Sequence, residues 1–183
     1  LSQKNHRLKL IQHGKKEGIG AALFYGCKFT TGNLIVFLDA DLSQSPFYIK
    51  EMMKFICLDF DMVIGSRYLK GSKQVNQTLF KKYGSFFFNK FTGLILNINL
   101  KDITHSFRIF KKNIFNEIGH LISQKGHPSF LIEFTLLAKK NNFKITEYPV
   151  TFIERDSSQG VSKLSISKEL IISLKFIISQ FLR

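Results

Sequence analysis

Two aspartates separated by a single residue are the feature of this sequence with the clearest chemical potential. Asp39 and Asp41 come directly after residues 34–38, an apolar run without polar alternation. Such a run predicts a buried parallel strand with both faces covered. Carboxylates at the carboxyl end of a strand lie where open α/β sheets bind their ligands. Two of them can hold a hard cation such as Mg²⁺ or Mn²⁺, whose remaining ligands are often substrate phosphates.

The alternative for this pair is a solvated turn that caps the next helix. Ser45 and Pro46 follow the aspartates, and a serine before a proline is typical of a helix start. The buried strand that the pair terminates favours a ligand site over a plain turn.

A cationic residue is expected at the same edge of the sheet. Residues 61–65 predict a second strand, and Arg67 follows it at its carboxyl end. The guanidinium of Arg67 should therefore lie on the same edge as the carboxylate pair. There it could bind phosphate through two parallel hydrogen bonds. The alternative is an ordinary surface arginine.

Hydrophobic periodicity predicts the elements that must position these residues. Helices are expected up to about residue 30, after Pro46, and over about 79–96, 130–141 and 166–183; further strands are expected at 8–11 and 143–152, and a polar loop at 70–77. The glycines and lysines of residues 14–20, before the first helix, could form an anion site. No domain boundary is evident, so residues 1–183 are predicted to form one domain that ends in an amphipathic helix at about 166–183.

The helix predicted at 79–96 carries a row of large apolar side chains. They recur at helical spacing and are Leu79, Tyr83, Phe86, Phe87, Phe91, Leu94 and Ile95. Such a row is usually part of a core, and the alternative is an apolar face turned toward lipid. Lys81, Lys82 and Ser85 at the start of this helix could then meet an anionic head group.

The overall composition restricts the class of partner. The 183 residues carry a formal net charge of +14 and include 20 phenylalanines. This charge favours anionic partners, which are nucleic acid, phosphorylated substrates or an anionic membrane surface. Nucleic acid is the least favoured of these, because no basic stripe interleaved with aromatic residues occurs. The two cysteines, Cys27 and Cys57, lack the spacing of a zinc site and are expected to be reduced thiols, which fits a cytosolic setting.

A series of short motifs occurs in an order that resembles a known family. The landmarks are Gly18-Ile19-Gly20-Ala21-Ala22, Thr31-Gly32-Asn33, Asp39-Ala40-Asp41-Leu42-Ser43, Pro46, Gly65-Ser66-Arg67-Tyr68, Asp102-x-Thr104-x-Ser106-Phe107-Arg108, Glu133, Pro149 and Gly160-x-Ser162-Lys163-Leu164. In this order they resemble the inverting family-two glycosyltransferases of GT-A fold. The closest resemblance is to the dolichyl- or polyprenyl-phosphate mannosyltransferase type.

The resemblance implies an α/β fold with a GT-A-like, Rossmann-like and mostly parallel sheet flanked by helices. In the family, a first strand with a P-x-Y-N-E-like motif and a D-D-x-S-x-D segment that holds the nucleoside precede these landmarks. This chain starts after both, so the N-terminal part and the first strands are expected to be missing. Either the chain is a fragment, or a companion chain such as a membrane subunit supplies the missing half.

The resemblance also implies a role for each matching residue. The catalytic residues would be Asp39, Asp41, Arg67 and Arg108. The donor would be bound by Gly18, Asp39 and Asp41, and the divalent cation by Asp39, Asp41 and Ser43. The acceptor phosphate would meet Arg67, Lys81, Ser85, Arg155 and Lys163. Lys81 stands where the family usually has an arginine.

The function implied by the resemblance is transfer of a hexose, with mannose expected, from a nucleotide-diphosphate sugar such as GDP-mannose to a polyprenyl or dolichyl phosphate. The transfer would invert the anomeric centre, require Mg²⁺ or Mn²⁺ and take place at the cytoplasmic face of a membrane, where the protein would be peripheral. A phosphate acceptor is already an anion, so no strong general base is required. The alternative is an inactive, truncated glycosyltransferase-like module that binds anionic lipid or a partner chain.

Overall fold

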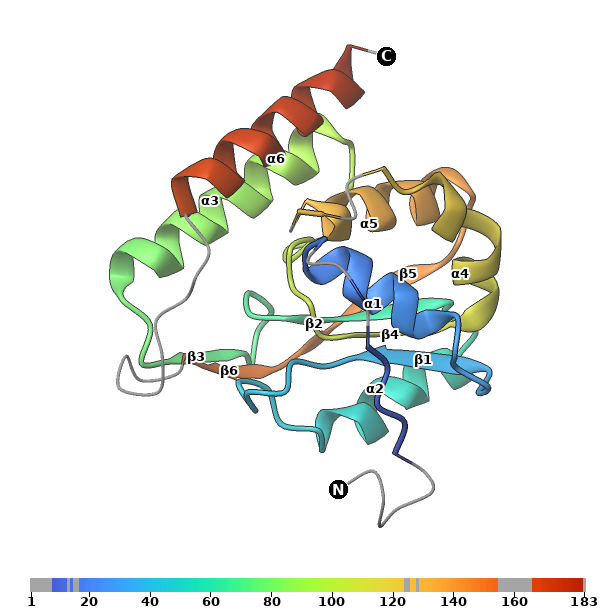
Figure 1. Cartoon of the computed structure of the whole chain (residues 1–183). Helices are drawn as coiled ribbons and strands as arrows, with labels where there is room; N and C mark the ends of the chain where they lie inside the picture. The colour runs from blue at the N-terminus through green and yellow to red at the C-terminus, as the bar shows by residue number, and fades with distance from the viewer. Residues whose placement is uncertain are drawn as a thin grey trace.

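In the computed structural model of the chain, a mixed sheet lies between layers of helices (Figure 1). The structure describes residues 8–12, 14, 17–123, 126–127, 129–154 and 166–182, with the side chains of the last helix described from residue 170 onward. The elements in chain order are α1 (Ile19–Cys27), β1 (Leu34–Phe37), α2 (Tyr48–Cys57), β2 (Met62–Ser66), β3 (Lys73–Val75), α3 (Leu79–Ile95), β4 (Arg108–Lys111), α4 (Lys112–Ile118), the 3-10 turn η1 (Gly119–Leu121), α5 (Phe130–Lys140), β5 (Ile145–Pro149), β6 (Thr151–Ile153) and α6 (Ile166–Phe181).

The main sheet has four described strands in the order β1-β4-β2-β5. β2 and β5 pair in parallel, whereas β4 runs antiparallel to both β1 and β2. β1, β2 and β5 therefore point in one direction, but the expectation of mostly parallel pairing is wrong and the sheet is mixed. The physical reason is the path of the chain. α3 and the segment after it bring the chain back to the edge where β1 and β2 end, so a strand that starts there has to run in the opposite direction.

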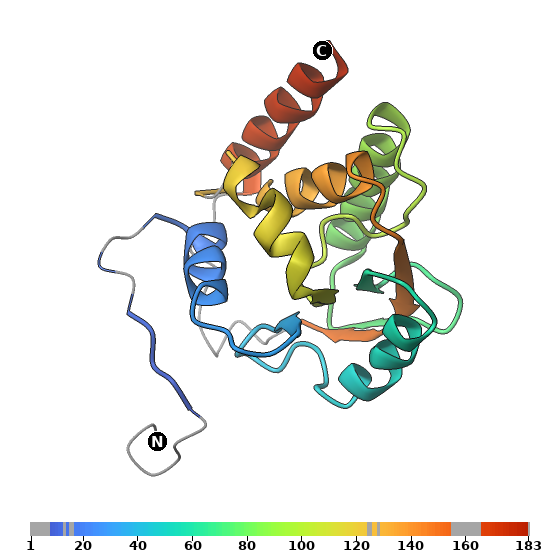
Figure 2. The same cartoon turned by 90° about the vertical axis from the view of Figure 1, so that its right-hand side faces the viewer.

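Helices cover the two faces of the sheet. On one face, Phe37 and Phe110 share a core with Phe24 of α1 and Phe134 of α5, and neighbouring rings meet edge to face with centroids 5.0–5.5 Å apart. On the other face, the fully buried Met52 of α2 packs in a cluster with residues of β2 and β4. Figure 2 shows α2 on one side of the strands and α1, α4 and α5 on the other. Much of the high phenylalanine content is therefore core.

β1 is an edge strand of the described sheet, and only one of its faces is fully covered. Ile35 and Phe37 are buried, but Val36 on the opposite face is 36% exposed. The expectation that both faces are covered is therefore wrong for this strand. In β2, by contrast, all of the residues are buried. The difference arises because α2 packs mainly on β2 and β4.

Two segments depart from their predicted local structure. Residues 73–75, predicted as part of a polar loop, form β3, which pairs in parallel with β6 in a second small sheet. Residues 8–11, predicted as a strand, have no regular structure, and Leu8 and Leu10 are exposed. In both cases the pairing partner decides the outcome, because a short strand is stable only beside another one.

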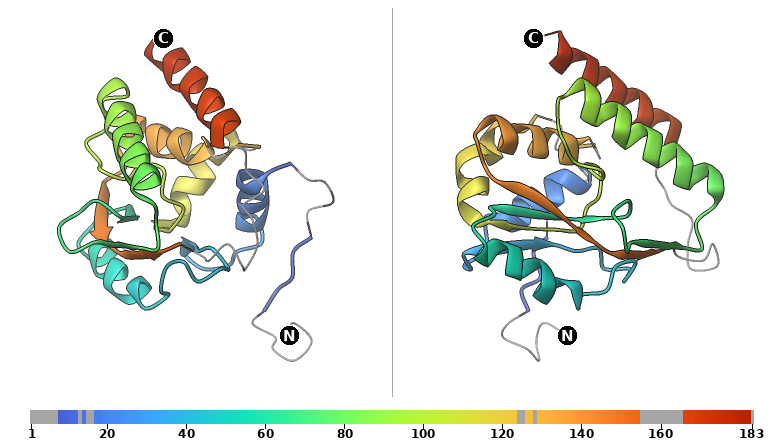
Figure 3. Two further views of the ribbon diagram at one scale, coloured as in Figure 1. Left: turned by 90° about the vertical axis from the view of Figure 1, so that its left-hand side faces the viewer. Right: turned by 180° about the vertical axis from the view of Figure 1, so that it is seen from behind.

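α3 is a long helix that extends past the end of the sheet, with α6 lying along it (Figures 1 and 3). It begins at Thr78, whose hydroxyl accepts a hydrogen bond from the backbone N–H of Lys81 at 3.4 Å. A cluster that includes Ile132 of α5 and Ile177 of α6 anchors this pair to the rest of the fold. None of the helices in the described part of the chain is long and apolar enough to cross a membrane.

The apolar row of α3 is mostly at the surface. The members that are exposed are Leu79, Tyr83, Phe86, Phe87, Phe91 and Leu94, with Leu94 at 81%. Phe80, which is not part of the predicted row, is 89% exposed. The expectation of a core row is therefore wrong for most of its length. The buried side of α3 is instead formed by Asn89, Thr92 and Gly93. Most of this row therefore does not contribute to the core of the described part of the chain.

Candidate active site

The two aspartates lie together at the carboxyl edge of the sheet, as predicted, next to the start of β4. The hydroxyl of Ser106 donates a hydrogen bond to Asp39 Oδ2 at 2.6 Å. This contact follows from the sheet register, because the first residue of β4, Arg108, pairs with the last residue of β1, Phe37. The other carboxylate oxygen of Asp39, Oδ1, accepts no hydrogen bond from the described residues. Ser106 thus orients Asp39 and leaves one oxygen for a ligand.

Asp41 is held by a tight turn. Its Oδ1 accepts a hydrogen bond from the backbone N–H of Ser43 at 3.0 Å, and Leu42 between them has a left-handed backbone with φ 57°. Ser43 itself is buried, and its carbonyl accepts a hydrogen bond from the N–H of Ile153 at 2.9 Å. The turn is therefore fastened to β6, which fixes the direction of the Asp41 carboxylate.

The donor set at this edge fits a hard divalent cation that is shared with a substrate. Two half-buried carboxylates, Asp39 and Asp41, supply oxygen ligands. The described residues include no group of three or more His, Cys, Asp or Glu side chains that could enclose a metal ion on their own. Mg²⁺ and Mn²⁺ commonly bind through one or two carboxylates and complete their coordination with phosphate oxygens and water.

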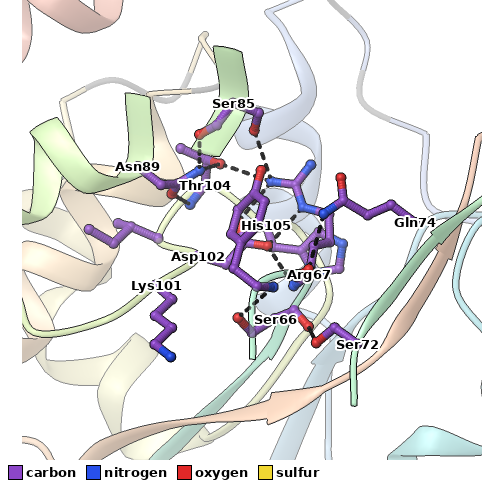
Figure 4. A network of polar contacts seen from close by, with 12 residues as sticks. Ser66, Arg67, Ser72, Gln74, Ser85, Asn89, Lys101, Asp102, Thr104 and His105 are labelled. Atoms are coloured by element: carbon purple, nitrogen blue, oxygen red, sulfur yellow. Dashed lines mark hydrogen bonds and ion pairs between the residues drawn. The ribbon is translucent and has the colours of Figure 1, made fainter. Parts of the chain in front are cut away.

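Arg67 lies at the end of β2, on the same edge, but its guanidinium is already paired. Its Nε and Nη2 donate to the two carboxylate oxygens of Asp102 at 2.7 Å each, and its backbone N–H donates to Asp102 Oδ2 at 2.9 Å (Figure 4). The side chain of Asp102 is fully buried and that of Arg67 is 11% exposed. Burial opposes ionisation of Asp102, but the facing guanidinium and its hydrogen bonds hold the pKa of that carboxyl below its usual value.

The ion pair extends into a polar network that joins the end of β2 to α3. Arg67 Nη2 lies 3.4 Å from the hydroxyl of Ser85 and 3.3 Å from that of Thr104. The buried Asn89 side chain accepts from the Thr104 N–H at 3.1 Å and donates to its hydroxyl at 3.0 Å. The structure thus brings Arg67 and Ser85 together, as the sequence predicts (Figure 4). Asp102 and Asn89, which hold this arrangement, were not predicted to act there.

The other predicted acceptor residues are placed differently. The ammonium group of Lys81 forms an ion pair with Glu154, just after β6. Arg155 and Lys163 lie outside the described residues. Of the predicted acceptor set, therefore, the structure brings together Arg67 and Ser85, while Lys81 sits nearby with a carboxylate as its partner.

Arg108, which the resemblance predicts to be catalytic, has no exposed surface in this structure through which it could contact a phosphate. Arg108 is fully buried, and its guanidinium donates to the carbonyls of Ile103 and His105 at 3.2 and 2.6 Å and to the hydroxyl of Thr135 at 3.2 Å. As the first residue of β4 it points into the interior, where it braces residues 103–105 against α5. The carbonyls of Ile103 and His105 and the hydroxyl of Thr135 accept from its two terminal nitrogens, which offsets part of the cost of burying the charge, whereas Nε has no hydrogen-bond partner among the described residues.

Gly18, predicted to contact the donor, has a structural requirement of its own. It precedes α1 with φ 95°, and a Cβ at this position would lie 2.1 Å from the carbonyl oxygen of Gly126. Only glycine fits both the left-handed backbone and the close approach. The glycine is explained by packing, and a contact with the donor stays a prediction.

His105 is buried beside Asp102, Arg67 and Arg108, and only its neutral form suits that environment. Burial lowers the pKa of His105 to about 4, with Asp102 opposing the shift and the two arginines adding to it. Its Nε2 lies 3.4 Å from the side-chain nitrogen of Gln44, an arrangement that fits the neutral ring as acceptor.

This buried histidine predicts a pH dependence of stability. In the unfolded chain His105 should bind a proton below about pH 6.5, whereas the folded chain resists protonation until about pH 4, so the free energy of unfolding should fall as the pH drops through that window. His105→Gln should flatten the fall by an amount on the order of 3 kcal/mol. The measurement is urea unfolding at several pH values. His120→Gln, at an exposed position, is the control, and identical pH curves for His105→Gln and the unmodified chain would contradict the prediction.

Comparison with known proteins identifies the family. Residues 1–119 match the family model described as "Glycosyl transferase family 2". The chain belongs to this family. It is 30% identical over 165 residues to polyprenol monophosphomannose synthase of Mycolicibacterium smegmatis, covering 87% of this chain and 60% of that protein. It is 28% identical over 169 residues to undecaprenyl-phosphate mannosyltransferase of Micrococcus luteus, covering 90% of this chain and 69% of that protein.

The resemblance to polyprenyl-phosphate mannosyltransferases that the motifs predict is thereby confirmed, and the chain spans about two thirds or less of the length of these family-2 relatives. Among solved structures it is similar to glucosyl-3-phosphoglycerate synthase from Mycobacterium tuberculosis. The complex with Mn²⁺, UDP and phosphoglyceric acid has a TM-score of 0.58 at 10% identity, covering 96% of this chain and 57% of that one. The UDP complex has a TM-score of 0.57 at 11% identity, with coverages of 98% and 59%. This likeness confirms the GT-A-like α/β fold.

Proposed function

We propose that this family-2 chain transfers mannose from a nucleoside-diphosphate sugar, with GDP-mannose the expected donor, to a polyprenyl phosphate. The observation that carries the proposal is the position of Asp39, Asp41 and Arg67 after two strand ends at one edge of the sheet. The chain also matches two proteins named as synthase or transferase of mannosyl lipid phosphates. Transfer inverts the anomeric centre and depends on Mg²⁺ or Mn²⁺, and it takes place at the cytoplasmic face of a membrane.

The reaction follows from the charges involved. An oxygen of the acceptor phosphate attacks C1 of the sugar, the new C1–O bond forms as the bond to the diphosphate breaks, and attack from the opposite face inverts C1. The acceptor is already an anion, so no side chain has to remove a proton. A divalent cation at Asp39 and Asp41 would neutralise charge that develops on the departing diphosphate. Ser106 keeps the Asp39 carboxylate aimed at that position.

The acceptor phosphate is proposed to bind near Arg67 and Ser85. Asp102 fixes the guanidinium so that Nε and Nη2 are occupied, while Nη1 makes no hydrogen bond to the described residues. Nη1 and the Ser85 hydroxyl are then the groups offered to an anion. Lys81 would exchange Glu154 for the phosphate when the acceptor binds. The exposed apolar row of α3 would face the membrane that carries the acceptor.

Calorimetric titration tests the donor site. The chain is titrated with GDP-mannose and with UDP-glucose, each with and without Mn²⁺. Metal-dependent binding of GDP-mannose is the expected result. Preference for UDP-glucose would replace mannose in the proposal, and no binding of either by a folded sample would favour the non-catalytic lipid-binding or partner-binding module.

Ser85→Ala is the sharpest test of the acceptor site. Arg67→Ala is less suitable, because it also leaves Asp102 buried without its partner. Losing one hydrogen bond to a charged group should lower kcat/KM for the polyprenyl phosphate about 10-fold to 100-fold and leave the donor Kd unchanged. Ser179→Ala, at an exposed position on α6, is the matched control. A weaker donor Kd with unchanged use of the acceptor would place Ser85 at the donor instead.

A further inference from the structure

One short segment between α3 and β4 contacts both of the proposed substrate sites. This bridging segment, residues 101–106, contains no helix or strand. Near its start the carboxylate of Asp102 accepts from Nε and Nη2 of Arg67 at 2.7 Å each (Figure 4), and at its end the hydroxyl of Ser106 donates to Asp39 at 2.6 Å. Because β4 lies between β1 and β2, the segment that leads into it links the ends of those two strands. One stretch of backbone therefore sets the separation of the cation site from the acceptor site.

Side chains from three elements hold the backbone of the bridging segment. Glu147 of β5 accepts from two N–H groups at its start, Asn89 of α3 accepts from an N–H in its middle, and Arg108 of β4 donates to two of its carbonyls. Asn89 and Arg108 are fully buried. Backbone polar groups that no helix or strand pairs need such partners. These three side chains therefore fix the path of the segment in place of a ladder of backbone hydrogen bonds.

Glu147 acts at the residue that holds Arg67. Its Oε2 accepts from the N–H of Lys101 and its Oε1 from the N–H of Asp102, each at 2.8 Å. Hydrogen bonds to an ionised carboxylate are stronger than those between neutral groups. Since the side chain of Asp102 in turn binds Arg67, the contacts run from β5 through Asp102 to the guanidinium at the acceptor site.

We propose that Glu147 is a positioning residue for the transfer reaction. By fixing the bridging segment, it keeps Arg67 and the acceptor phosphate at the distance from the cation site that attack on the sugar requires. Reacting atoms have to approach to about 3–3.5 Å in the correct orientation, and a misplacement of about 1 Å can cost about 100-fold in rate. The inference rests on the proposed function and adds to it a residue of β5.

Glu147→Gln tests this role by kinetics. Glutamine keeps the length of the side chain and one acceptor oxygen, but its amide nitrogen faces one of the two backbone N–H donors, so the segment should shift. The expected result is a fall in kcat of about 10-fold to 100-fold, with the donor Kd and the KM of the polyprenyl phosphate unchanged within about 3-fold. Glu117→Gln, at an exposed position on α4, removes the same charge and should leave kcat unchanged.

Thermal unfolding establishes that both variants fold. If Glu147→Gln does not fold, Glu147→Asp takes its place. Aspartate keeps the charge, but it is one methylene shorter and so withdraws from both N–H groups, and the same fall in kcat is expected.

Nuclear magnetic resonance of the arginine side chains gives a readout that needs no activity. In the chain labelled with ¹⁵N-arginine, the Nε–H of Arg67 should exchange slowly with water, because it donates to a fully buried carboxylate. Its signal is identified by its absence from Arg67→Lys. Glu147→Gln should speed this exchange about 10-fold, the effect of weakening the network by one hydrogen bond, and Glu117→Gln should not change it.

Three outcomes would overturn the role of Glu147. They are an unchanged kcat in a folded variant, a higher acceptor KM at unchanged kcat, and an unchanged exchange rate of the Arg67 Nε–H. A lower melting temperature with unchanged kcat would assign Glu147 to stability alone. If the unmodified chain transfers no sugar, the proposed function fails, and the exchange rate still decides whether Glu147 positions Arg67.

Discussion

Asp41→Asn should reduce sugar transfer by about two to three orders of magnitude and abolish Mn²⁺-dependent binding of the donor. Asparagine has nearly the same shape, and its side-chain oxygen can still accept the hydrogen bond from the Ser43 N–H, so the turn should persist. What the substitution removes is the negative charge that a hard cation requires at this edge of the sheet.

The measurement is calorimetry with GDP-mannose in the presence and absence of Mn²⁺, together with the transfer rate. Asp59→Asn is the matched control: Asp59 pairs with Lys144 at the surface and has a left-handed backbone that asparagine tolerates. It should leave both quantities unchanged. If Asp41→Asn keeps the metal dependence of donor binding, Asp41 is not a ligand of the cation.

Asp102→Ala should lower the free energy of unfolding by about 3–5 kcal/mol. The carboxylate is fully buried and accepts three hydrogen bonds from Arg67, so its removal leaves a nearly buried guanidinium without a counter-charge. Arg67→Met/Asp102→Leu removes both charges and should recover most of the loss, because apolar side chains of similar size can replace a buried ion pair. Together with the single variants Arg67→Met and Asp102→Leu, this double variant forms a double-mutant cycle that gives the coupling free energy.

Urea unfolding at neutral pH measures these differences.

The same ion pair predicts how stability responds to acid. Because the pKa of Asp102 is below its usual value in the folded chain, its contribution is present above the unfolded-state pKa and is lost as the pH falls through the folded-state pKa. Asp102→Ala should therefore lose less stability than the unmodified chain in that acid range. If Asp102→Ala lowers the free energy of unfolding at neutral pH by less than about 1 kcal/mol, the ion pair contributes no more than a surface pair does. It would then not hold the site together.

The local sequence predicts the elements that depend on local spacing. β2 and the helices α1, α2, α3 and α5 occur close to their predicted positions because apolar periodicity, Pro46 and the glycines act within a few residues. The sequence likewise predicts that Asp39 and Asp41 follow the end of one strand and that Arg67 follows the end of the next strand along the chain. The position of a residue relative to the end of its own strand is a local property.

Long-range pairing accounts for what the sequence does not predict. β3 is polar and three residues long, and it exists because β6 lies beside it. The insertion of β4 between β1 and β2 brings Ser106 to Asp39, and it turns Arg108 inward, away from any phosphate. The sequence shows Asp102 as part of a motif. Its structural role depends on the ion pair with Arg67, which lies 35 positions earlier in the chain.

The sequence by itself determined the chemical groups of this protein: two carboxylates for a cation, a cationic residue at the same edge, and a helix with a long aromatic row. The tertiary structure decided which of these groups are available. It paired Arg67 with Asp102, buried Arg108 and left the aromatic row of α3 at the surface. The physical reason is that residue type and spacing set what a side chain can do, whereas its exposure and its partner are set by segments far away in the chain.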